Sequence, residues 1–489
     1  MKYLLGIDFG GGASKATLLG CDGKISAEHT VEYPTLHPEA GACEQAPSDW
    51  VSALYENTST LLKTSGVSPS DIIAVAIDSA THTFLPCDEN FAPLYNAIHW
   101  TDSRSVSQAK ALRESYGDRI FELTYHKPDT VWTLPQLVWL RENHPDVFEK
   151  MRYIFFEKDY IRYLLTGVYC TDCIEAQGSM LYDTECGMWS DELCALAGID
   201  TDMLPPVVKP TDVIGAITKS ASELTGLKEG TPVICGTTDT VMEVLAAGAT
   251  RKGATTVKLA TAGRICVITD KPYPDRDVVN YSHVKDGLWY PGSATKAAAS
   301  SFRWYRDTFG GDYRELDEGA KNTPVGCDGL RFHPYINGEL TPYADPKLCG
   351  SFIGIRSTHT KGHFTRSVLE GVAFSLLHSK KKLISLGVPC SNSATLIGGG
   401  AKSPLWSQIV ADCLDMELTV TQSSDSSLGS AMLAGVAMGI FESFDEAVEK
   451  CIHTKRKVTP NPENTKIYNE IFEEYVRVHD ALAPIYDER

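Results

Sequence analysis

The chain of 489 residues lacks long apolar runs, and this excludes two classes of protein. The longest mostly apolar stretch that we find is 432–441, short of the roughly 20 residues that a membrane-spanning helix needs. The apolar run at the N-terminus is broken by Asp8, which leaves it too short for a signal peptide. We therefore expect a cytoplasmic protein with no membrane partner.

Basic residues are also scarce. The chain has 45 Lys and Arg against 63 Asp and Glu, a formal charge of -18. Sequence-independent binding to nucleic acid depends on clustered Lys and Arg, and the densest basic run, 380–382, is too short for that. We expect no nucleic-acid partner. With 43% hydrophobic and 22% charged residues, the chain can bury a large core, divided at this length into two or three domains.

Paired cysteine motifs are almost missing. The 14 cysteines are scattered, and only Cys170 and Cys173 form a C-x-x-C. Without a second pair at zinc-finger spacing or a histidine that would mark haem attachment, this pair predicts neither a zinc nor a haem site. Free, mostly buried thiols in a reducing compartment are the simpler interpretation.

Strand-like and helix-like segments alternate along the chain, which favours an α/β fold. Residues 3–7 lead through a glycine turn into 16–19, a pattern that predicts a β-hairpin. A helix over 48–63, with Ser48 as its N-cap, and a buried strand over 72–77 are expected to follow.

A second opening of the same kind lies in the middle of the chain. Residues 255–259 lead through small residues into 265–269, and the apolar strand 233–235 precedes them. The repetition predicts two domains on a duplicated plan, 1–245 and 246–489. No low-complexity linker separates these halves, so we expect a packed hinge between them.

Three turns consist of small residues, which let backbone N–H groups approach phosphate oxygens closely. They are 10–12, 260–263, and 398–403, the last leading into a helix over 405–414. A glycine-rich loop at a helix N-terminus suits a nucleotide. The patterns G-x-x-x-x-G-K-[ST] and G-x-G-x-x-G are both absent, so we expect neither a P-loop kinase nor a dinucleotide-dependent oxidoreductase.

Two aspartates stand beside these turns. Asp8 ends the first apolar strand, and Asp239 follows the strand 233–235. A carboxylate at the end of a buried strand costs stability unless a charged group meets it, which is why Asp8 is a candidate functional residue. Two such carboxylates suit metal-assisted phosphoryl transfer, one beside the metal-nucleotide and one as proton acceptor. Asp239 taken alone also fits a local Asx turn.

Sequence blocks in a fixed order span nearly the whole chain. Residues 6–15 match G-I-D-x-G-T-x-x-x-K at most positions, 77–82 match I-S-x-Q-M-H in part, and 97–104 are similar to A-I-L-W-x-D-x-R. Together they resemble the FGGY carbohydrate kinases, most widely those that phosphorylate xylulose. Further similar blocks are 132–140, 158–167, 350–370, 398–406 and 428–431.

The resemblance implies two ribonuclease-H-like (actin-like ATPase) domains that flank a catalytic cleft, with the sugar mainly on the first and ATP with Mg²⁺ mainly on the second. Asp239 matches the family's general base, and Asp8 matches its metal-nucleotide carboxylate. Sugar-contacting positions correspond to Thr81, His82, Trp100, Asp102 and Asp239. Nucleotide-binding positions correspond to Gly10, Gly11, Gly12, Lys15, Thr261, Gly263, Gly398, Gly399, Gly400, Ala401 and Lys402.

The sequence departs from the family pattern at several of these positions. Gly11 stands where Thr is usual, Ala262 replaces a hydroxyl residue, and Arg264 is unusual after that turn. Thr81 and His82 follow Ala80, where the pattern reads Q-M-H. The expected substrate is a ketopentose, D-xylulose at its 5-hydroxyl, with ribulose, ribitol or erythritol as alternatives. An actin- or Hsp70-like ATPase without a sugar acceptor is the alternative from another class, and a homodimer is compatible with the resemblance.

Overall fold

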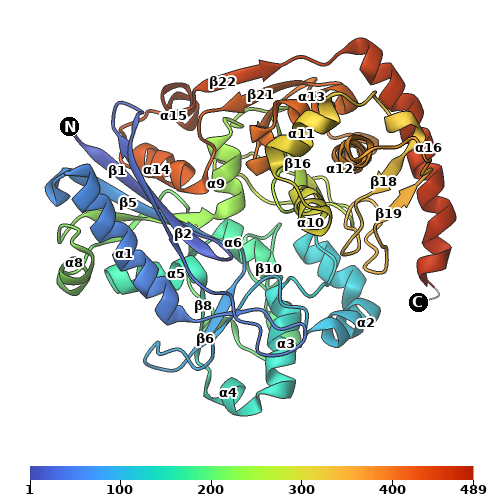
Figure 1. Cartoon of the computed structure of the whole chain (residues 1–489). Coiled ribbons are helices and arrows are strands. Elements are labelled where there is room, and N and C mark those ends of the chain that lie inside the picture. Colours follow the sequence, from blue (N-terminus) through green and yellow to red (C-terminus); the bar gives the residue numbers. More distant parts are fainter. Residues whose placement is uncertain (488–489) are drawn as a thin grey trace. The chain divides into compact units, whose positions relative to one another are not determined.

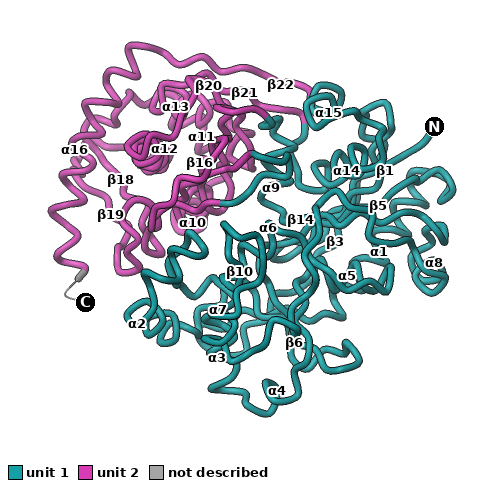
Figure 2. Tube along the Cα trace, turned by 180° about the vertical axis from the view of Figure 1, so that it is seen from behind, with its two compact units in different colours: residues 1–250, 281–287, 423–452 teal, residues 251–280, 288–422, 453–489 magenta. Residues whose placement is uncertain are grey.

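The protein is described here by a computed structural model, which covers residues 1–487. The chain forms two compact units (Figure 2). Unit 1 comprises Met1–Thr250, Tyr281–Gly287 and Ser423–Ile452, and unit 2 comprises the remaining described residues. Ser423–Ile452 therefore belongs to a different unit from the segments that flank it in sequence, whereas the predicted domains 1–245 and 246–489 are continuous. Those domains stay a prediction.

Unit 1 is built on a six-stranded sheet of order β13-β14-β5-β1-β2-β3. β1 pairs with β5 in parallel and β5 with β14 in parallel, while β2, β3 and β13 pair antiparallel to their neighbours. The predicted hairpin is thus confirmed as β1 and β2, and the predicted strand as β5. The bounds are β1 Tyr3–Phe9, β2 Ala13–Gly20, β3 Ile25–Glu32, β5 Ile72–Ser79, β13 Val213–Ala216 and β14 Pro232–Thr238.

Helices cover this sheet. Helix α1 (Pro47–Ser65) packs on β2 and β3 and confirms the predicted helix, but Ala46 and not Ser48 is its N-cap. Pro47 explains the earlier start, because proline at a first helical position lacks only an N–H that would have no helical partner. Helix α14 (Ser426–Ala437), orange-red in Figure 1, lies against β1, β2 and β5. A Cβ on Gly6 would lie 1.9 Å from the Ser427 carbonyl oxygen, so only glycine allows this approach.

The remainder of unit 1 holds smaller sheets and peripheral helices. A four-stranded sheet has the order β4-β7-β6-β8, and two-stranded sheets pair β9 with β12 and β10 with β11. The strand bounds are β4 Glu44–Gln45, β6 Phe84–Cys87, β7 Ala97–Ile98, β8 Tyr153–Phe156, β9 Thr171–Asp172, β10 Tyr182–Asp183, β11 Met188–Trp189 and β12 Val207–Val208. The helix bounds are α2 Val106–Thr124, α3 Thr133–Asn143, α4 Pro145–Lys150, α5 Glu157–Thr166, α6 Cys173–Gly178, α7 Asp191–Ala197, α8 Lys219–Thr225, α9 Asp239–Ala246 and α15 Phe444–Cys451.

Unit 2 repeats the sheet plan. Its six-stranded sheet has the order β17-β16-β15-β20-β21-β22, with β15, β20 and β21 parallel and the others antiparallel to their neighbours. The predicted second opening is confirmed as β15 and β16. The bounds are β15 Thr255–Leu259, β16 Gly263–Val267, β17 Gly292–Thr295, β20 Ser393–Ile397, β21 Glu417–Thr421, β22 Thr454–Val458, and, in a separate pair, β18 Arg331–His333 and β19 Ser351–Ile353.

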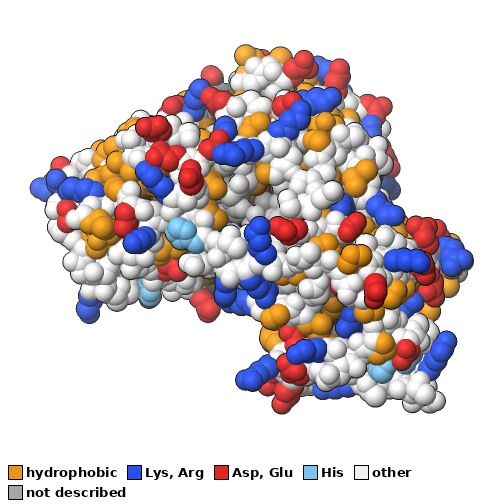
Figure 3. All heavy atoms as spheres, turned by 90° about the horizontal axis from the view of Figure 1, so that it is seen from above, with side chains coloured by type: hydrophobic (Ala, Val, Ile, Leu, Met, Phe, Trp, Pro, Cys, Tyr) orange, Lys and Arg blue, Asp and Glu red, His pale blue; other side chains and the backbone are white. Residues whose placement is uncertain are grey.

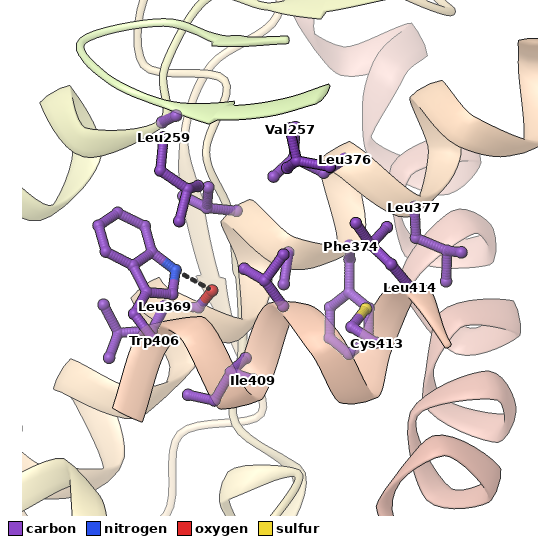
Figure 4. Close-up of a cluster of buried hydrophobic side chains, with 14 of the residues drawn as sticks. Val257, Leu259, Leu369, Phe374, Leu376, Leu377, Trp406, Ile409, Cys413 and Leu414 are labelled. Atoms are coloured by element: carbon purple, nitrogen blue, oxygen red, sulfur yellow. Dashed lines mark hydrogen bonds between the residues drawn. The ribbon is translucent and has the colours of Figure 1, made fainter. Parts of the chain in front are cut away.

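Helices α12 (Lys361–Ser385) and α13 (Pro404–Leu414) pack together beneath this sheet and carry much of the unit 2 core (Figure 4). Trp406 is fully buried, and its indole N–H donates to the Leu369 carbonyl oxygen over 3.1 Å, which satisfies its one polar atom. The other helices of the unit are α10 Ala299–Phe309, α11 Tyr313–Lys321 and α16 Pro462–Asp487.

The surface and the thiols agree with the composition. On the face shown in Figure 3, acidic and basic side chains are interspersed. All 14 cysteines are free, and most are buried, as predicted. Within residues 1–487, no helix has both the length and the apolar character to cross a membrane.

Candidate functional site

Three acidic residues meet at one edge of the unit 1 sheet. Asp8 lies near the end of β1 and is paired in register with Asp78 of β5, and Asp239 directly follows β14. Since β1, β5 and β14 are parallel, their carboxyl ends lie at the same edge, which is where open α/β sheets bind ligands. The fold thus collects residues that are separated by up to 231 positions in sequence.

Burial and mutual repulsion perturb these carboxyl groups. Burial raises the pKa of Asp8 to about 7, and the charges of Asp239 and Glu243 add to the rise, although a hydrogen bond with Asp78 opposes it. Burial, followed by the charge of Asp8, holds the pKa of Asp78 well above its ordinary value. The Ser430 hydroxyl donates to Asp78 Oδ2 over 2.5 Å. Asp8 and Asp78 therefore share at least one proton unless a cation lies near them.

Asp239 is the first residue of α9, where the positive end of the helix dipole favours a carboxylate. The Thr240 hydroxyl donates to Asp239 Oδ1 over 3.2 Å, and the side chain is half-buried. A carboxylate held at a helix start and accessible from one side can accept a proton from a bound hydroxyl.

Glu157 belongs to the same cluster, and the sequence analysis missed it. It begins α5, is fully buried, and accepts from the Tyr33 hydroxyl over 3.5 Å. Burial, with the charges of Asp8 and Asp239, raises the pKa of Glu157 well above its ordinary value. An acid directly after the apolar strand β8 is the same signal that singled out Asp8, and it could have identified both Glu157 and Asp78.

The turn 10–12 connects β1 to β2 and is suited to a phosphate. A Cβ on Gly10 would meet nothing closer than 3.5 Å, and one on Gly12 nothing closer than 3.9 Å. Neither glycine has a positive φ. The fold itself does not demand glycine at these positions, so close approach of a ligand is the better reason for their small size. The Tyr33 hydroxyl donates to the Gly10 carbonyl oxygen over 2.5 Å and anchors the turn.

Lys15, a predicted phosphate contact, is engaged within unit 1. Its ammonium group pairs with Glu28 over 2.8 Å and with Asp425. A phosphate would have to compete with these two carboxylates for Lys15.

Thr81 and His82 lie together against α6. A Cβ on Gly178 would lie 2.8 Å from both side chains, so glycine at that position permits the packing. His82 has a φ of 48°, and its backbone N–H donates to Glu175, which fixes this unusual conformation. Burial, with the nearby His126 and His99, lowers the pKa of His82 to about 3, so its ring is neutral.

A buried charge network supports this region. The Lys158 ammonium lies 2.6 Å from Asp159, 2.9 Å from Asp172 and 4.0 Å from Glu175, and all four side chains are fully buried. Asp172 also accepts from the Thr237 hydroxyl over 2.8 Å, which connects the network to β14 just before Asp239. These contacts hold the His82 segment and the end of β14 in a common framework.

The other two predicted sugar contacts differ in exposure. Trp100 is 39% exposed, whereas Asp102 is 1% exposed. Asp102 pairs with Arg104 over 2.8 Å and accepts from the Cys43 backbone N–H over 2.8 Å. Both of its oxygens are occupied, so the ordinary ion pair accounts for Asp102 in this structure, and its contact with a sugar stays a prediction.

In unit 2, the turn 260–263 links β15 to β16. The Thr261 hydroxyl is exposed and accepts from the Arg303 guanidinium over 3.5 Å, and its carbonyl oxygen accepts from the Ser300 hydroxyl over 2.8 Å. Packing explains why position 263 is glycine, because a Cβ there would lie 2.7 Å from Thr295 on β17. Thr261 therefore presents a hydroxyl and a nearby cation to a ligand, while Gly263 keeps the strands in contact.

The loop 398–402 follows β20. Gly398 has a φ of 90°, and its Cβ would lie 2.6 Å from the Leu259 carbonyl oxygen, so this position requires glycine. A Cβ on Gly400 would lie 2.8 Å from Leu259, whereas one on Gly399 would meet nothing within 4 Å. Gly399 and Lys402 are exposed, and Ala401 is buried. Of these three glycines, Gly399 is the one that packing does not explain, and a nucleotide bound against its backbone would explain it.

The residues at the acidic edge fit a divalent cation in part. Asp8 Oδ1 and Asp78 Oδ1 are buried and accept no hydrogen bond among the described residues. A cation would offset the burial and, to a smaller extent, the repulsion that raise their pKa values. Within residues 1–487, no group of three or more His, Cys, Asp or Glu has the arrangement of a metal site. Any Mg²⁺ would thus take few protein ligands and keep oxygens of water or phosphate, as it commonly does.

Comparisons with known proteins point in one direction. Residues 3–246 match the N-terminal domain, and 233–438 the C-terminal domain, of the FGGY family of carbohydrate kinases. A xylulose kinase from Bacillus subtilis is 32% identical over 98% of this chain and 97% of its own length. A gluconokinase from Bacillus licheniformis is 29% identical, covering 99% and 97%. The crystal structure of ligand-bound xylulose kinase from Lactobacillus acidophilus superposes with a TM-score of 0.94 at 25% identity, covering 100% of both chains.

Proposed function

The chain belongs to the FGGY family of carbohydrate kinases and is a phosphotransferase with a sugar as acceptor, and we propose that its preferred substrate is D-xylulose, phosphorylated at the 5-hydroxyl. The fold of two ribonuclease-H-like domains that the resemblance implied is confirmed by these matches and by the repeated sheet order. The observation that carries the mechanism is the meeting of Asp8, Asp78 and Asp239 at one sheet edge.

Asp239 acts as the general base in this proposal. Its carboxylate accepts the proton of the sugar hydroxyl while the start of α9 stabilises the charge that it holds beforehand. ATP supplies the phosphoryl group. The proposed phosphate contact of unit 1 is the turn 10–12, and the proposed nucleotide contacts of unit 2 are Thr261 and the loop 398–402. Asp8 would hold Mg²⁺, which neutralises phosphate charge when bound. His82, Thr81 and Trp100 would orient the sugar.

D-gluconate is the second candidate substrate, because a gluconokinase is nearly as similar to this chain as the xylulose kinase is. The test is a panel of D-xylulose, D-ribulose, ribitol, erythritol and D-gluconate at fixed ATP and Mg²⁺, with kcat/KM as the measured quantity. We expect D-xylulose to give the highest value. A higher kcat/KM for any other member would reject the proposed substrate but leave the family assignment intact.

A further inference from the structure

The imidazole of His99 faces the glycine turn that follows β1. His99 comes directly after β7 and is 3% exposed. If Gly11 carried a Cβ, that atom would lie 3.4 Å from His99 Nε2 and 3.5 Å from Cε1. Gly11 itself is exposed. The space that the missing side chain leaves therefore adjoins Nε2, and an oxygen placed there would need to shift only a few tenths of an ångström to accept a hydrogen bond.

The hydrogen-bond partners determine which ring nitrogen carries the proton. The backbone N–H of Thr101 donates to His99 Nδ1 over 3.3 Å. Because a backbone N–H can only donate, Nδ1 must be the acceptor and carries no proton. Burial, with a smaller contribution from His37, lowers the pKa of His99 to about 4, so the ring is neutral near pH 7. The single ring proton is then assigned to Nε2, the nitrogen that faces Gly11.

The backbone of His99 is held in place, and its ring is buried. The His99 backbone N–H donates to the Cys43 carbonyl oxygen over 3.0 Å, and its carbonyl oxygen accepts from the Asp102 backbone N–H over 2.9 Å and from the Gln136 side-chain amide over 3.3 Å. The Thr101 hydroxyl lies 2.7 Å from Nδ1 and also contacts Cys43 Sγ over 3.0 Å. A donor held this firmly is preorganised for a ligand.

Despite this, His99 Nε2 has no hydrogen-bond partner among residues 1–487, although it is buried. Buried donors are nearly always paired, because an unmet donor loses its bonds to water and receives nothing in exchange. The fold has thus placed a neutral donor beside the turn 10–12 that follows Asp8.

We propose that His99 donates a hydrogen bond from Nε2 to a phosphoryl oxygen during transfer, through the space that Gly11 leaves open. This inference rests on the proposed kinase function. A neutral donor aimed at developing charge strengthens its bond in the transition state more than in the ground state, so it raises kcat more than it improves substrate binding. Gly11 and His99 then act together, because glycine leaves the space through which the imidazole reaches the phosphoryl oxygen.

The test compares His99→Leu, which removes the donor, with His99→Gln, whose amide N–H₂ can reach a similar point. His29→Leu is the matched control, because His29 on β3 also has a buried Nε2 without a partner among the described residues but is not part of the site. Steady-state kinetics are measured with the best sugar of the panel. A second readout is the Kd of ADP with aluminium fluoride, a mimic of the transferring phosphoryl group, in the presence of that sugar.

We expect His99→Leu to lower kcat by about 10²-fold with little change in sugar KM, to weaken the mimic by a similar factor, and to be partly rescued in His99→Gln. His29→Leu should match the unaltered protein. Gly11→Ala, which fills the space while leaving His99 in place, should also lower kcat, and this variant serves if His99→Leu fails to fold. Unchanged kcat and mimic affinity, or a rise in sugar KM alone, would overturn the proposal. If the unaltered protein phosphorylates no sugar, the proposed function fails instead.

Discussion

The two large sheets of this molecule have the same order and the same strand directions, yet their ligand-binding edges differ in chemistry. In unit 1, acids stand at the ends of the three parallel strands. In unit 2, the corresponding positions carry no acid. Asp8 is the last residue but one of β1 and is paired in register with Asp78, and Asp239 follows β14; in unit 2, Lys258 is the last residue but one of β15 and is paired in register with Ile397, and Gln422 follows β21.

We propose that the duplicated plan divides one reaction between the two sheets. The shared sheet order supplies two edges of the same shape, and only the residues placed there decide what each edge does. Unit 1 provides the carboxylates that proton transfer and cation binding need. A polyphosphate beside these carboxylates needs a cation to offset their repulsion, whereas the edge of unit 2, which has no acid at the matching positions, adds no such repulsion in a protein whose formal charge is -18.

The largest expected effect is the loss of the general base. Asp239→Asn keeps the shape of the side chain but cannot accept the proton, so we expect kcat to fall by roughly 10³-fold while the Kd of ATP stays within about twofold. Asp191→Asn is the matched control, because Asp191 begins α7 as Asp239 begins α9. Steady-state kinetics and nucleotide titration measure both quantities. If the kcat of Asp239→Asn is close to that of the control, Asp239 is not the general base.

The buried charge network of unit 1 should be costly to break. Lys158→Met leaves Asp159, Asp172 and Glu175 without their shared cation, and we expect the free energy of unfolding to fall by about 3–5 kcal/mol. Lys209→Met removes the exposed pair with Asp286 and should cost far less stability than Lys158→Met. Urea unfolding measures both. Equal losses in the two variants would show that the network does not hold the edge together.

The raised pKa of Asp8 predicts a pH dependence of stability. Its pKa is about 7 in the folded protein against 3.8 unfolded, so the folded state binds more protons, and stability attributable to Asp8 is present at low pH and lost as the pH rises toward 7. Asp8→Asn lacks this loss. The free energy of unfolding of Asp8→Asn relative to the unaltered protein should therefore be greater at pH 8 than at pH 5, by on the order of 2 kcal/mol. A difference that is the same at both pH values contradicts the raised pKa of the buried Asp8 carboxyl group.

The smallest effect concerns the loop 398–402 of unit 2. Gly398→Ala must adopt a φ of 90° and should lower the free energy of unfolding by about 1–3 kcal/mol. Gly399→Ala enters open space, so its stability should change by less than about 0.5 kcal/mol, while the Kd of ATP rises several-fold. Thermal unfolding and nucleotide titration separate the two variants. Unchanged ATP affinity in Gly399→Ala would remove the role assigned to this loop.

Much of the fold was predictable from the sequence because it is encoded locally. Apolar runs ended by turns of small residues identified both hairpins, and the recurrence of that pattern identified the duplicated plan, which the strand pairings confirm. The start of α1 was predicted wrongly at Ser48, since Pro47 shifts the first turn of the helix. The family blocks led to the correct fold and enzyme class.

What could not be predicted depends on contacts between distant residues. Helix α14 belongs to unit 1, where its backbone approaches Gly6 closely. No local sequence pattern near residue 426 predicts this contact. Similarly, the pairing of Lys158 with Asp172 and the orientation of His99 toward Gly11 appear only once the chain is folded. The roles of the predicted site residues stay predictions until ligands are bound.

The most direct test of the account is to follow ATP consumption and sugar phosphorylation together by ³¹P NMR, with D-xylulose as acceptor. The account predicts one D-xylulose 5-phosphate for each ATP consumed, no appreciable inorganic phosphate, and loss of both signals in Asp239→Asn. Hydrolysis of ATP to inorganic phosphate at the same rate with and without sugar would contradict it, because the acidic edge of unit 1 would then serve an ATPase and not a sugar kinase.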